Sequence, residues 1–294
     1  MEDYRQIIQY ALTGLSNGAI YALIGFGFAV IFNATGIINF AQGEFVMLGG
    51  MATLFFFSVL NLPLPLAVLL AVLASTAVGI AFDYLAIRPL KKPTPLALVI
   101  ITIGVSILLR GIVMLLWGKD THALPAFTGN EPIYFLDATL LPQHLWIFAI
   151  AVVVIVLSRL FFHYSIVGKA MRACSYNRRA AGLVGIDVVR MVRLSFAISS
   201  AVGSLAGIII APLTMTSYDV GIMLGLKGFC TAIIGGMSNG VGRVAAGLLL
   251  GILESFGAGL VSASYKEAIV FVILLVILFI RPQGLFGQAE AERV

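Results

Sequence analysis

Four ionisable residues interrupt long apolar stretches of this sequence, where an isolated charge is costly. They are Glu44, Arg110, Lys227 and Glu254. In an apolar medium such side chains must face protein or water, so each is a candidate for a pathway that polar solutes follow or for a structural ion pair. We expect Lys227 and Glu254, which have opposite charges, to pair. Arg110 precedes Trp117 by two turns and is expected to reach outward as an anchor.

A polar cluster stands beside glycines at the start of one apolar stretch. Asn39, Gln42 and Glu44 lie close together and are followed by Gly49 and Gly50. Amide and carboxylate groups at such an entrance can line a cavity and contact a polar solute. We predict that Asn39, Gln42 and Glu44 line a substrate pathway.

We find no group of residues in the sequence that predicts catalysis or metal binding. It contains no HExxH or CxxC motif and no phosphate-binding loop. Its three histidines, His122, His144 and His163, fall at opposite ends of the predicted spans and cannot share one metal ion. Cys174 and Cys230 have no ligand-like neighbours, so we expect neither a disulfide nor a metal site. We predict no catalytic residue, no metal and no cofactor bound by this chain.

The composition excludes a soluble globular protein. Hydrophobic residues make up 61% of the 294 residues and charged residues 11%, and the mean hydropathy is +1.08. This leaves too little polar surface to cover a soluble fold. The isoelectric point near 9.3 does not indicate nucleic-acid binding, because the positive charge lies in short loops between apolar stretches. We predict an all-α, polytopic bundle of transmembrane helices.

A helix needs about 20 apolar residues to cross a bilayer, which predicts about 8–10 spans here. We place them near residues 7–31, 40–60, 64–87, 96–117, 144–163, 189–212, 222–237, 242–262 and 266–281. The short, glycine-rich segment near 222–237 is expected to be broken or re-entrant. We expect one domain over 1–294, an external loop over 118–143 and a short cytoplasmic tail over 284–294. The acidic first residues do not resemble a cleavable signal peptide.

Glycines recur at four-residue spacing, which lets helices approach closely in lipid. The chain holds 31 glycines. The pairs are Gly14 and Gly18, Gly203 and Gly207, Gly221 and Gly225, Gly236 and Gly240, and Gly247 and Gly251. They predict a compact bundle. A short similarity between residues 39–50 and 228–236 is consistent with an inverted repeat that contains broken helices.

The loop over residues 163–193 concentrates positive charge between two apolar stretches, and its net charge of +5 equals the formal charge of the whole chain. Its cations are Lys169, Arg172, Arg178, Arg179, Arg190 and Arg193. Short loops rich in Lys and Arg stay on the cytoplasmic side of a membrane. We therefore predict that this loop and the C-terminus are cytoplasmic and that the N-terminus is outside. The only cations then left outside are Arg5, Lys119 and Lys266.

Small residues recur at helical intervals within the basic loop. Ala170, Cys174, Asn177, Ala181 and Val184 predict a short helix with one face of small side chains beside arginines. Two interpretations remain open on this pattern alone. The helix can lie in a groove of another protein, or the loop can be a solvated segment that only sets the topology.

Sequence blocks along nearly the whole chain resemble the branched-chain amino acid ABC transporter permeases, in the order found in that family. Blocks in and after the basic loop are GKAMRA at 168–173, AA at 180–181, GID at 185–187, FAI at 196–198 and LAG at 205–207. The others are GIINFAQGE at 36–44, RPL at 88–90, TIGVS at 102–106, LKGF at 226–229, IGG at 234–236 and RPQGLFG at 281–287. The RPL and TIG blocks are similar to the LivH-type subunit.

The resemblance implies a division of labour in the bacterial cytoplasmic (inner) membrane. This chain would be embedded in membrane lipid beside a second permease subunit, with two ATP-binding subunits inside and a substrate-binding protein outside. ATP would be used by the partner subunits. Residues 168–186, which we call the coupling segment, would sit in a cleft of an ATP-binding subunit. The implied coupling residues are Gly168, Ala170, Arg172, Ala173, Ala181, Gly185 and the adjoining Asp187.

Several alternatives stay open on the sequence. Relatives in this family serve leucine, isoleucine and valine, or amides, urea and other small polar solutes, so family membership does not fix the substrate. The second permease subunit can be a different chain or another copy of this one. An ion-coupled secondary transporter, with Glu44 and Glu254 as ion carriers, is the rival class. It would leave the arginine-flanked helix without a partner.

Overall fold

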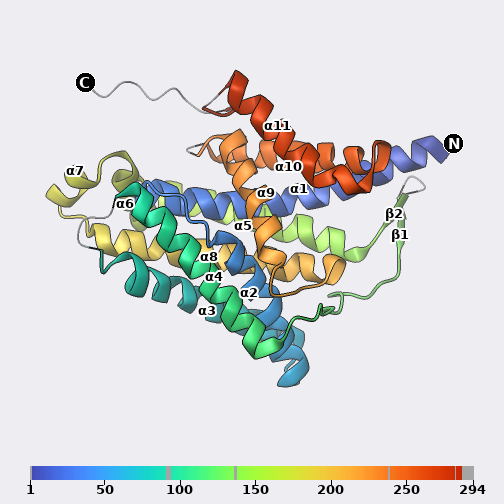
Figure 1. The fold of residues 1–294 in the computed structure, drawn as a ribbon, viewed down its shortest axis with the longest axis horizontal. Helices are drawn as coiled ribbons and strands as arrows, with labels where there is room; N and C mark the ends of the chain where they lie inside the picture. Colours follow the sequence, from blue (N-terminus) through green and yellow to red (C-terminus); the bar gives the residue numbers. More distant parts are fainter. Residues whose placement is uncertain (1, 91–93, 136–137, 238, 282, 287–294) are drawn as a thin grey trace. The chain divides into compact units, whose positions relative to one another are not determined.

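A computed structural model describes residues 2–90, 94–135, 138–237, 239–281 and 283–286, and nearly all of the regular structure is helical (Figure 1). The longer helices are α1 (Glu2–Thr35), α2 (Gln42–Leu54), α3 (Leu64–Phe82), α4 (Pro95–Trp117), α5 (Pro142–Tyr164), α8 (Val188–Thr214), α9 (Val220–Gly235), α10 (Gly240–Leu260) and α11 (Lys266–Ile280). The short elements are α6 (Ile166–Tyr176), α7 (Arg178–Leu183), η1 (Phe55–Val59), η2 (Asp83–Ile87), η3 (Ala263–Tyr265), β1 (Ile133–Phe135) and β2 (Ala138–Leu140).

In the part of the chain that the structure describes, eight helices are long and apolar enough to cross a membrane, and α9 is a shorter apolar helix. Each coincides within a few residues with a span predicted from the sequence, so the polytopic, all-α prediction is confirmed. α9 runs unbroken through Gly221, Gly225 and Gly228, so the expectation of a broken helix is wrong. Of the predicted tail, residues 287–294 lie outside the described residues.

Polar residues define where several helices begin. Each lies at the N-cap with extended backbone and accepts a hydrogen bond from an N–H of the first turn, a donor that has no partner within the helix. These caps are Thr94 for α4, Ser165 for α6, Asn177 for α7, Asp187 for α8 and Asn239 for α10. Three of them follow one another between α5 and α8, and they organise the basic loop into helices.

The chain divides into two compact units. Unit 1 comprises Met1–Phe26, Ala126–Ala151 and Leu226–Val294, and unit 2 comprises Gly27–Pro125 and Val152–Gly225. Three of the four divisions fall inside continuous helices, α1, α5 and α9, and the fourth follows Pro125 in the segment between α4 and β1. The single transmembrane domain expected from the sequence stays a prediction.

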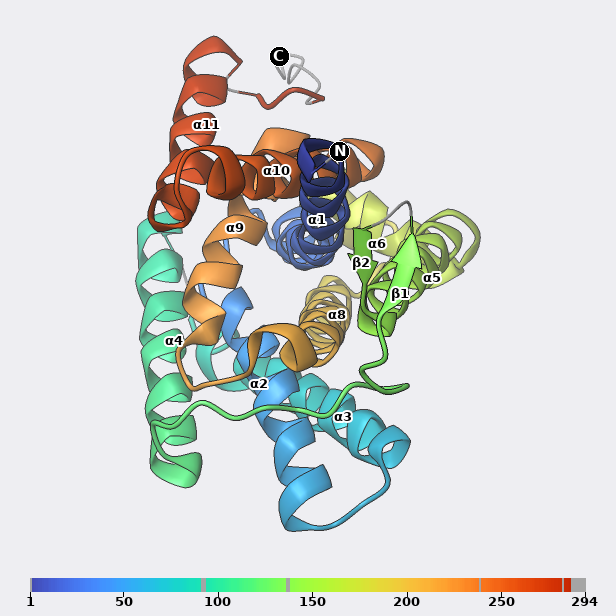
Figure 2. The ribbon, with the colours of Figure 1, turned by 90° about the vertical axis from the view of Figure 1, so that its right-hand side faces the viewer.

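In unit 2, α2 packs against α8, α3 and α4 (Figure 2). α2 approaches α8 closely because Gly207 faces the backbone of Val46, and a side-chain carbon at Gly207 would overlap the Val46 carbonyl oxygen. Phe45, Phe82 and Phe196 fill the same core. Ring centroids lie 6.5 Å apart between Phe45 and Phe82, and 5.2 Å apart between Phe82 and Phe196. Close backbone contact at small residues is how helices associate in lipid.

In unit 1, α10 packs along the first part of α1 through two of the predicted glycine pairs (Figure 1). Gly18 meets the backbone of Gly247 and Leu248, and Gly251 meets the backbone of Gly14 and Gly18. Any side chain at these glycines would collide with the neighbouring helix backbone. The close packing predicted for these pairs is therefore confirmed, and α11 packs on α10 beside it.

Two loops differ from the expectation. Gly236 and Gly240 are not a helix-packing pair, because Gly236 turns the chain after α9 with a φ of +81° and Gly240 begins α10. Within the loop predicted over 118–143, β1 and β2 form a small antiparallel hairpin in which Tyr134 pairs with Thr139. Strands of three residues are too short to produce a recognisable alternation in the sequence.

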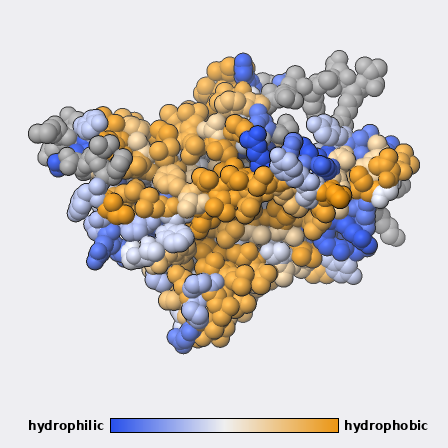
Figure 3. Space-filling view, turned by 180° about the vertical axis from the view of Figure 1, so that it is seen from behind, coloured by the Kyte–Doolittle hydropathy of each residue, from blue (hydrophilic) through white to orange (hydrophobic). Residues whose placement is uncertain are grey.

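Apolar side chains cover much of the molecular surface, as Figure 3 shows for one face. α5 and α11 are the least buried of the spans, and both are strongly apolar. Exposed apolar faces of this extent are stable against lipid or against another apolar protein surface. The chain is a multi-pass membrane protein.

Replacing Gly207 by leucine is expected to destabilise unit 2 by about 3 kcal/mol, the upper end of the cost of overpacking, because the obstructing atom belongs to backbone. Gly104→Leu on α4 is the matched control, since no described atom lies within 4 Å of its side-chain position. Thermal unfolding of the purified chain in detergent measures the difference. Equal unfolding temperatures for the two variants would contradict the close approach of α2 and α8.

Candidate functional site

Glu44 is a buried carboxylate held between two helices of unit 2. It lies in the first turn of α2 and is 2% exposed. Its Oε1 accepts a hydrogen bond from Ser106 Oγ on α4 at 2.6 Å and lies 3.3 Å from Arg110 Nε on the same helix. The predicted pathway residue Glu44 therefore belongs to an ion pair that joins α2 to α4.

α4 presents a polar stripe to the start of α2. Thr102, Ser106 and Arg110 are spaced by four residues, so they share one face of the helix. Thr102 and Ser106 are buried, and Thr102 Oγ1 accepts a hydrogen bond from the Phe40 N–H at 3.2 Å. Neither Thr102 nor Ser106 was selected from the sequence. Polar residues at helical spacing in an otherwise apolar span are the signal that points to them.

The expectation that Arg110 reaches outward as an anchor is wrong. Its side chain is only 28% exposed, and its guanidinium lies beside Glu44. Opposite charges attract strongly in surroundings of low dielectric constant, so a carboxylate within reach outweighs the pull toward the end of the span. Trp117, at that end, packs instead against the Phe55 ring at a centroid distance of 5.7 Å.

Asn39 and Gln42 are also buried, but they make different contacts. Asn39 Oδ1 accepts a hydrogen bond from the Ala41 N–H at 3.1 Å, whereas its Nδ2 has no hydrogen-bond partner among the described residues. Gln42 Nε2 donates to Ser199 O at 3.3 Å, and Ser199 Oγ lies 2.6 Å from Gln42 Oε1. Gln42 therefore ties α2 to α8 through both ends of its amide. The pathway role of Asn39, Gln42 and Glu44 stays a prediction.

Lys227 and Glu254 form a second buried ion pair, in unit 1. Lys227 Nζ on α9 donates to Glu254 Oε1 on α10 at 2.7 Å, and the two side chains are 6% and 5% exposed. Tyr21 OH on α1 donates to Glu254 Oε2 at 2.7 Å, and its ring centroid lies 5.5 Å from Lys227 Nζ. Both carboxylate oxygens are satisfied. This closed triad joins α1, α9 and α10 and contains the pair expected from opposite charge.

A serine and a histidine also meet in unit 1 without the geometry of a catalytic pair. We overlooked one match to a catalytic pattern in the sequence, because GLSNG at 14–18 fits the nucleophile pattern G-x-S-x-G. Its central serine, Ser16, has its Oγ 2.8 Å from His144 Nδ1. That pattern works at a sharp turn between a strand and a helix. Ser16 instead lies inside α1, and its hydroxyl donates to Leu12 O at 2.9 Å. The serine therefore lies in a regular helix and has a backbone acceptor of its own, unlike a nucleophile presented at a turn.

The coupling segment is helical, but it is not one helix. α6 and α7 are separated by Asn177, whose backbone is extended at a φ of −155° and whose side chain caps α7. The single short helix expected from the spacing of Ala170 to Val184 is therefore wrong. A favourable cap at Asn177 ends the first helix and begins the second.

The implied coupling residues differ in exposure. Gly168 and Ala181 are buried, Ala170 and Ala173 are partly buried, and Arg172 is exposed. Gly168 packs against α5, where a side chain would overlap a backbone carbonyl oxygen. A bulky residue at Gly168 would therefore disturb the fold of the segment as well as any partner that docks on it.

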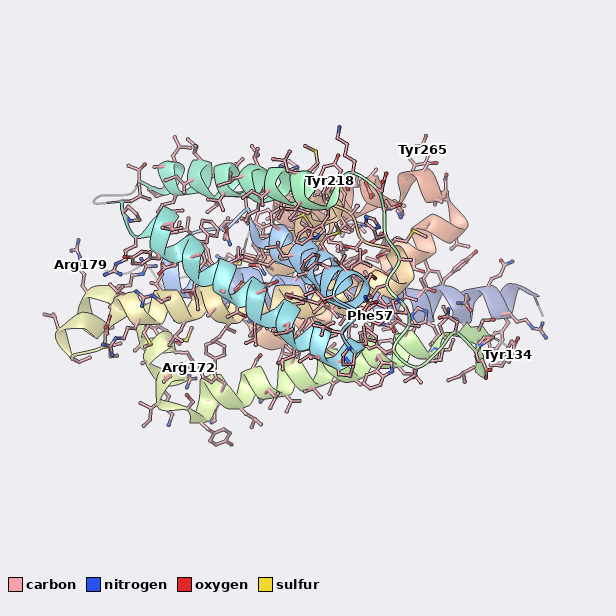
Figure 4. All side chains as sticks on the ribbon, turned by 90° about the horizontal axis from the view of Figure 1, so that it is seen from below. Phe57, Tyr134, Arg172, Arg179, Tyr218 and Tyr265 are labelled. Carbon is pink, nitrogen blue, oxygen red and sulfur yellow. The ribbon has the colours of Figure 1, made fainter. Side chains whose placement is uncertain are left out.

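The segment ends in a turn and a cap. Gly185 turns the chain with a φ of +87°, and Asp187 caps α8 while its Oδ2 lies 2.8 Å from Arg190 Nε. Arg172 and Arg179 are exposed side chains of α6 and α7, and Figure 4 shows them toward the same end of unit 2. The cations predicted to set the topology thus lie on three capped helices, α6, α7 and α8.

Large apolar side chains are exposed on the coupling segment and next to it. Leu183 is 89% exposed, Val184 is 77% exposed and Ile166 is 85% exposed. None of the three lies in a candidate membrane span. Exposed apolar groups at such a place favour contact with another protein. The sequence pattern placed Val184 on one face with Ala181, but Ala181 is buried and Val184 is not.

Arg178 joins the coupling segment to the end of α1. Its Nη2 donates to Ala34 O in the last turn of α1, where backbone carbonyls lack helical partners and a cation is favourable. Burial lowers the pKa of the Arg178 guanidinium from its usual value. Beyond Ala34 the chain turns at Gly36, with a φ of +68°, and leads to Asn39 and α2. The coupling segment and the Glu44 site are therefore a short stretch of chain apart.

Membrane-length helices, buried polar groups within them and a capped, charged helical segment between two of them define a membrane transport protein. The sequence matches the family described as branched-chain amino acid transport system / permease component over residues 10–278. The chain belongs to this family. It is a permease of the ABC transporter type, a transport subunit, as the sequence resemblance predicted.

Full-length relatives agree with this assignment. The high-affinity branched-chain amino acid transport system permease protein LivH of Escherichia coli is 29% identical over 100% of this chain and 99% of its own length. The corresponding protein BraD of Pseudomonas aeruginosa is 31% identical over 100% of both chains. The probable LivH protein of Methanocaldococcus jannaschii is 26% identical over 91% of this chain and 89% of its own. The LivH-type resemblance is confirmed.

Lys227→Met should destabilise unit 1 by about 3–5 kcal/mol, because it leaves the Glu254 carboxylate buried without its cation. The double variant Lys227→Met with Glu254→Gln should recover most of the loss, since no buried charge remains. Lys266→Met, at an exposed lysine, is the control and should unfold like the wild type. Unfolding temperatures in detergent measure these effects. A double variant no more stable than Lys227→Met alone would contradict the pairing.

Proposed function

We propose that this chain is the membrane-spanning permease subunit of an ATP-driven importer for branched-chain amino acids. It acts with a second permease subunit, two ATP-binding subunits and an external substrate-binding protein, in the bacterial cytoplasmic membrane. The observation that carries the proposal is the end-to-end similarity to LivH and BraD, both named for branched-chain amino acid transport. The chain itself binds no cofactor, and ATP is hydrolysed by the partner subunits.

The coupling segment is the docking site for an ATP-binding subunit. Support comes from its two faces: Leu183 and Val184 project outward, while Ala181 and Arg178 contact the rest of unit 2. A partner that grips the outer face moves α7, and the Arg178 hydrogen bond passes that displacement to the end of α1. Alternating access then follows from movement of otherwise rigid helices.

The proposed orientation places the N-terminus outside and the C-terminus in the cytoplasm. Contacts between loops support the alternation of spans that this requires. His122 and Thr216, both expected outside, form a backbone bridge. Asn239 and Phe286, both expected inside, are joined by a hydrogen bond from Asn239 Nδ2 to Phe286 O at 3.0 Å. The basic loop then sets which side is cytoplasmic.

The rival class is less well supported by the two buried carboxylates. A proton- or ion-coupled carrier needs a carboxylate that can exchange its partner during the cycle. Glu254 is closed between Lys227 and Tyr21 and does not meet this need, which leaves Glu44, paired with Arg110, as the one of the two that can exchange its partner. An amide or urea permease, the other alternative, has no evident use for a charged pair beside its pathway.

The importer, reconstituted with its partner subunits in vesicles, is expected to accumulate L-leucine only when ATP reaches the ATP-binding subunits. Excess valine or isoleucine should compete, and excess urea should not. Ionophores that collapse proton and sodium gradients serve as the control and should leave the initial rate unchanged. Uptake that stops with the ionophores and ignores ATP would establish the secondary transporter instead.

Leu183→Glu should reduce uptake about tenfold or more, because it places a charge in the proposed interface, and loss of about 1.4 kcal/mol of binding free energy lowers affinity tenfold. The amount of permease in the membrane should not change, since Leu183 is exposed in the isolated chain. Tyr134→Glu is the matched control: Tyr134 is 74% exposed but lies on the external hairpin. Equal uptake by both variants would remove the docking role from the coupling segment.

A further inference from the structure

We propose that Glu44 and Arg110 form a binding site for the two charged groups of a free α-amino acid. The Glu44 carboxylate binds the ammonium group of the solute, and the Arg110 guanidinium binds its carboxylate. In the empty site the two side chains neutralise each other. This inference rests on the proposed function and deepens it, because it names the groups of this chain that recognise a zwitterion.

The carboxylate of Glu44 is only half engaged. Oε1 accepts the Ser106 hydrogen bond, which fixes the side chain, whereas Oε2 has no hydrogen-bond partner among the described residues although it is buried. A buried carboxylate oxygen without a partner is costly, because it has lost its hydrogen bonds to water. An ammonium group, with three donors, satisfies that oxygen and can still approach Oε1.

The guanidinium of Arg110 is held loosely. Its Nε lies 3.3 Å from Glu44 Oε1, yet this nitrogen forms no hydrogen bond within the described part of the chain. Arg110 is also the more accessible partner, 28% exposed against 2% for Glu44. A solute carboxylate therefore meets Arg110 first, and a planar guanidinium binds carboxylates in bidentate fashion. Moving Arg110 toward the solute uncovers Glu44.

The energetics favour a solute that carries both charges. Separating a buried ion pair is costly, because each member is left without a counter-charge. A zwitterion supplies both counter-charges at once, so neither Glu44 nor Arg110 is left unpaired during the exchange. A neutral amide or urea supplies neither. A simple amine supplies a counter-charge for Glu44 only, and a simple carboxylate supplies one for Arg110 only. In each case the other side chain is left without a counter-charge.

The apolar part of such a solute has a suitable neighbourhood. Val105 and Leu109 precede Ser106 and Arg110 by one residue on α4, and both are partly buried against the core that contains Phe45 and Val113. Because this part of α4 borders an apolar core, it suits a solute whose remaining atoms are a branched hydrocarbon.

The Lys227–Glu254 pair shows what a closed structural pair looks like in the same chain. Its nitrogen-to-oxygen distance is 2.7 Å, both side chains are about equally buried, and Tyr21 occupies the second carboxylate oxygen. The Glu44–Arg110 pair is longer, unequal in exposure and unsatisfied at its second oxygen. The contrast indicates that the Lys227–Glu254 pair is permanent, whereas the Glu44–Arg110 pair can exchange its partners for a solute.

The test measures ligand preference by saturation-transfer NMR on the assembled importer in lipid nanodiscs, without the binding protein. The probes are L-leucine, isocaproate, which lacks the ammonium group, and isoamylamine, which lacks the carboxylate. We expect the wild type to bind leucine about tenfold or more tightly than either analogue. Arg110→Gln should bind isoamylamine as well as leucine, and Glu44→Gln should bind isocaproate as well as leucine. Arg159→Gln, at an exposed arginine of α5, should keep the wild-type preference.

The variants separate this inference from the proposed function. Leucine preference that persists in both Arg110→Gln and Glu44→Gln, while the wild type transports leucine, overturns the zwitterion site alone. A wild type that neither transports nor binds leucine overturns the proposed function. Should Glu44→Gln unfold, Arg110→Gln decides by itself, and Arg110→Lys should restore part of the preference because it restores the positive charge.

Discussion

A charge inside a membrane span must be paired with an opposite charge or hydrogen-bonded to the backbone, and this constraint organises the interior of the protein. Glu44 is matched by Arg110 and Glu254 by Lys227, each across two helices. In unit 1 the matching is complete and closed by Tyr21, so the triad fixes α1, α9 and α10 to one another. In unit 2 the matching is incomplete, because Glu44 Oε2 has no hydrogen-bond partner among the described residues. This unsatisfied oxygen is the basis for our proposal that the pair recognises a ligand.

Glycine makes these arrangements possible. Gly207 lies against Val46, and Gly18 lies against Gly247. These contacts bring α2 close to α8, where Ser199 meets Gln42, and α1 close to α10, where Tyr21 meets Glu254. Outside the spans, capping residues perform the organising role. Asn177 divides the basic loop into α6 and α7, which places Arg178 under the end of α1 and Leu183 at the surface. The coupling segment contacts the rest of unit 2 on one side and exposes the Leu183 side chain on the other. It is therefore suited to pass a partner's movement to α1.

Much of the fold follows from the sequence, because span length and apolar content are local properties. The observed helix bounds agree with the predicted spans within a few residues. The glycine pairs of α1 and α10 pack closely, as their spacing predicts. What depends on tertiary contact was harder to predict. Arg110 was predicted to be an anchor because its partner, Glu44, lies 66 positions earlier in the sequence. Thr102 and Ser106 gain a role only through their contacts with α2 and the residues before it, which the sequence does not reveal. The spacing of small residues predicted one helix through Asn177, but Asn177 ends α6.

The central claim is that an ATP-binding subunit grips the coupling segment of this permease. Cysteine crosslinking tests it most directly, because Cys174 and Cys230 are both buried and burial raises the pKa of the Cys174 thiol, so the native background is low. With Leu183→Cys in the assembled importer, the account predicts a crosslink to an ATP-binding subunit, and none with Tyr134→Cys. A complex that hydrolyses ATP and transports leucine, yet never crosslinks at position 183, would contradict the account.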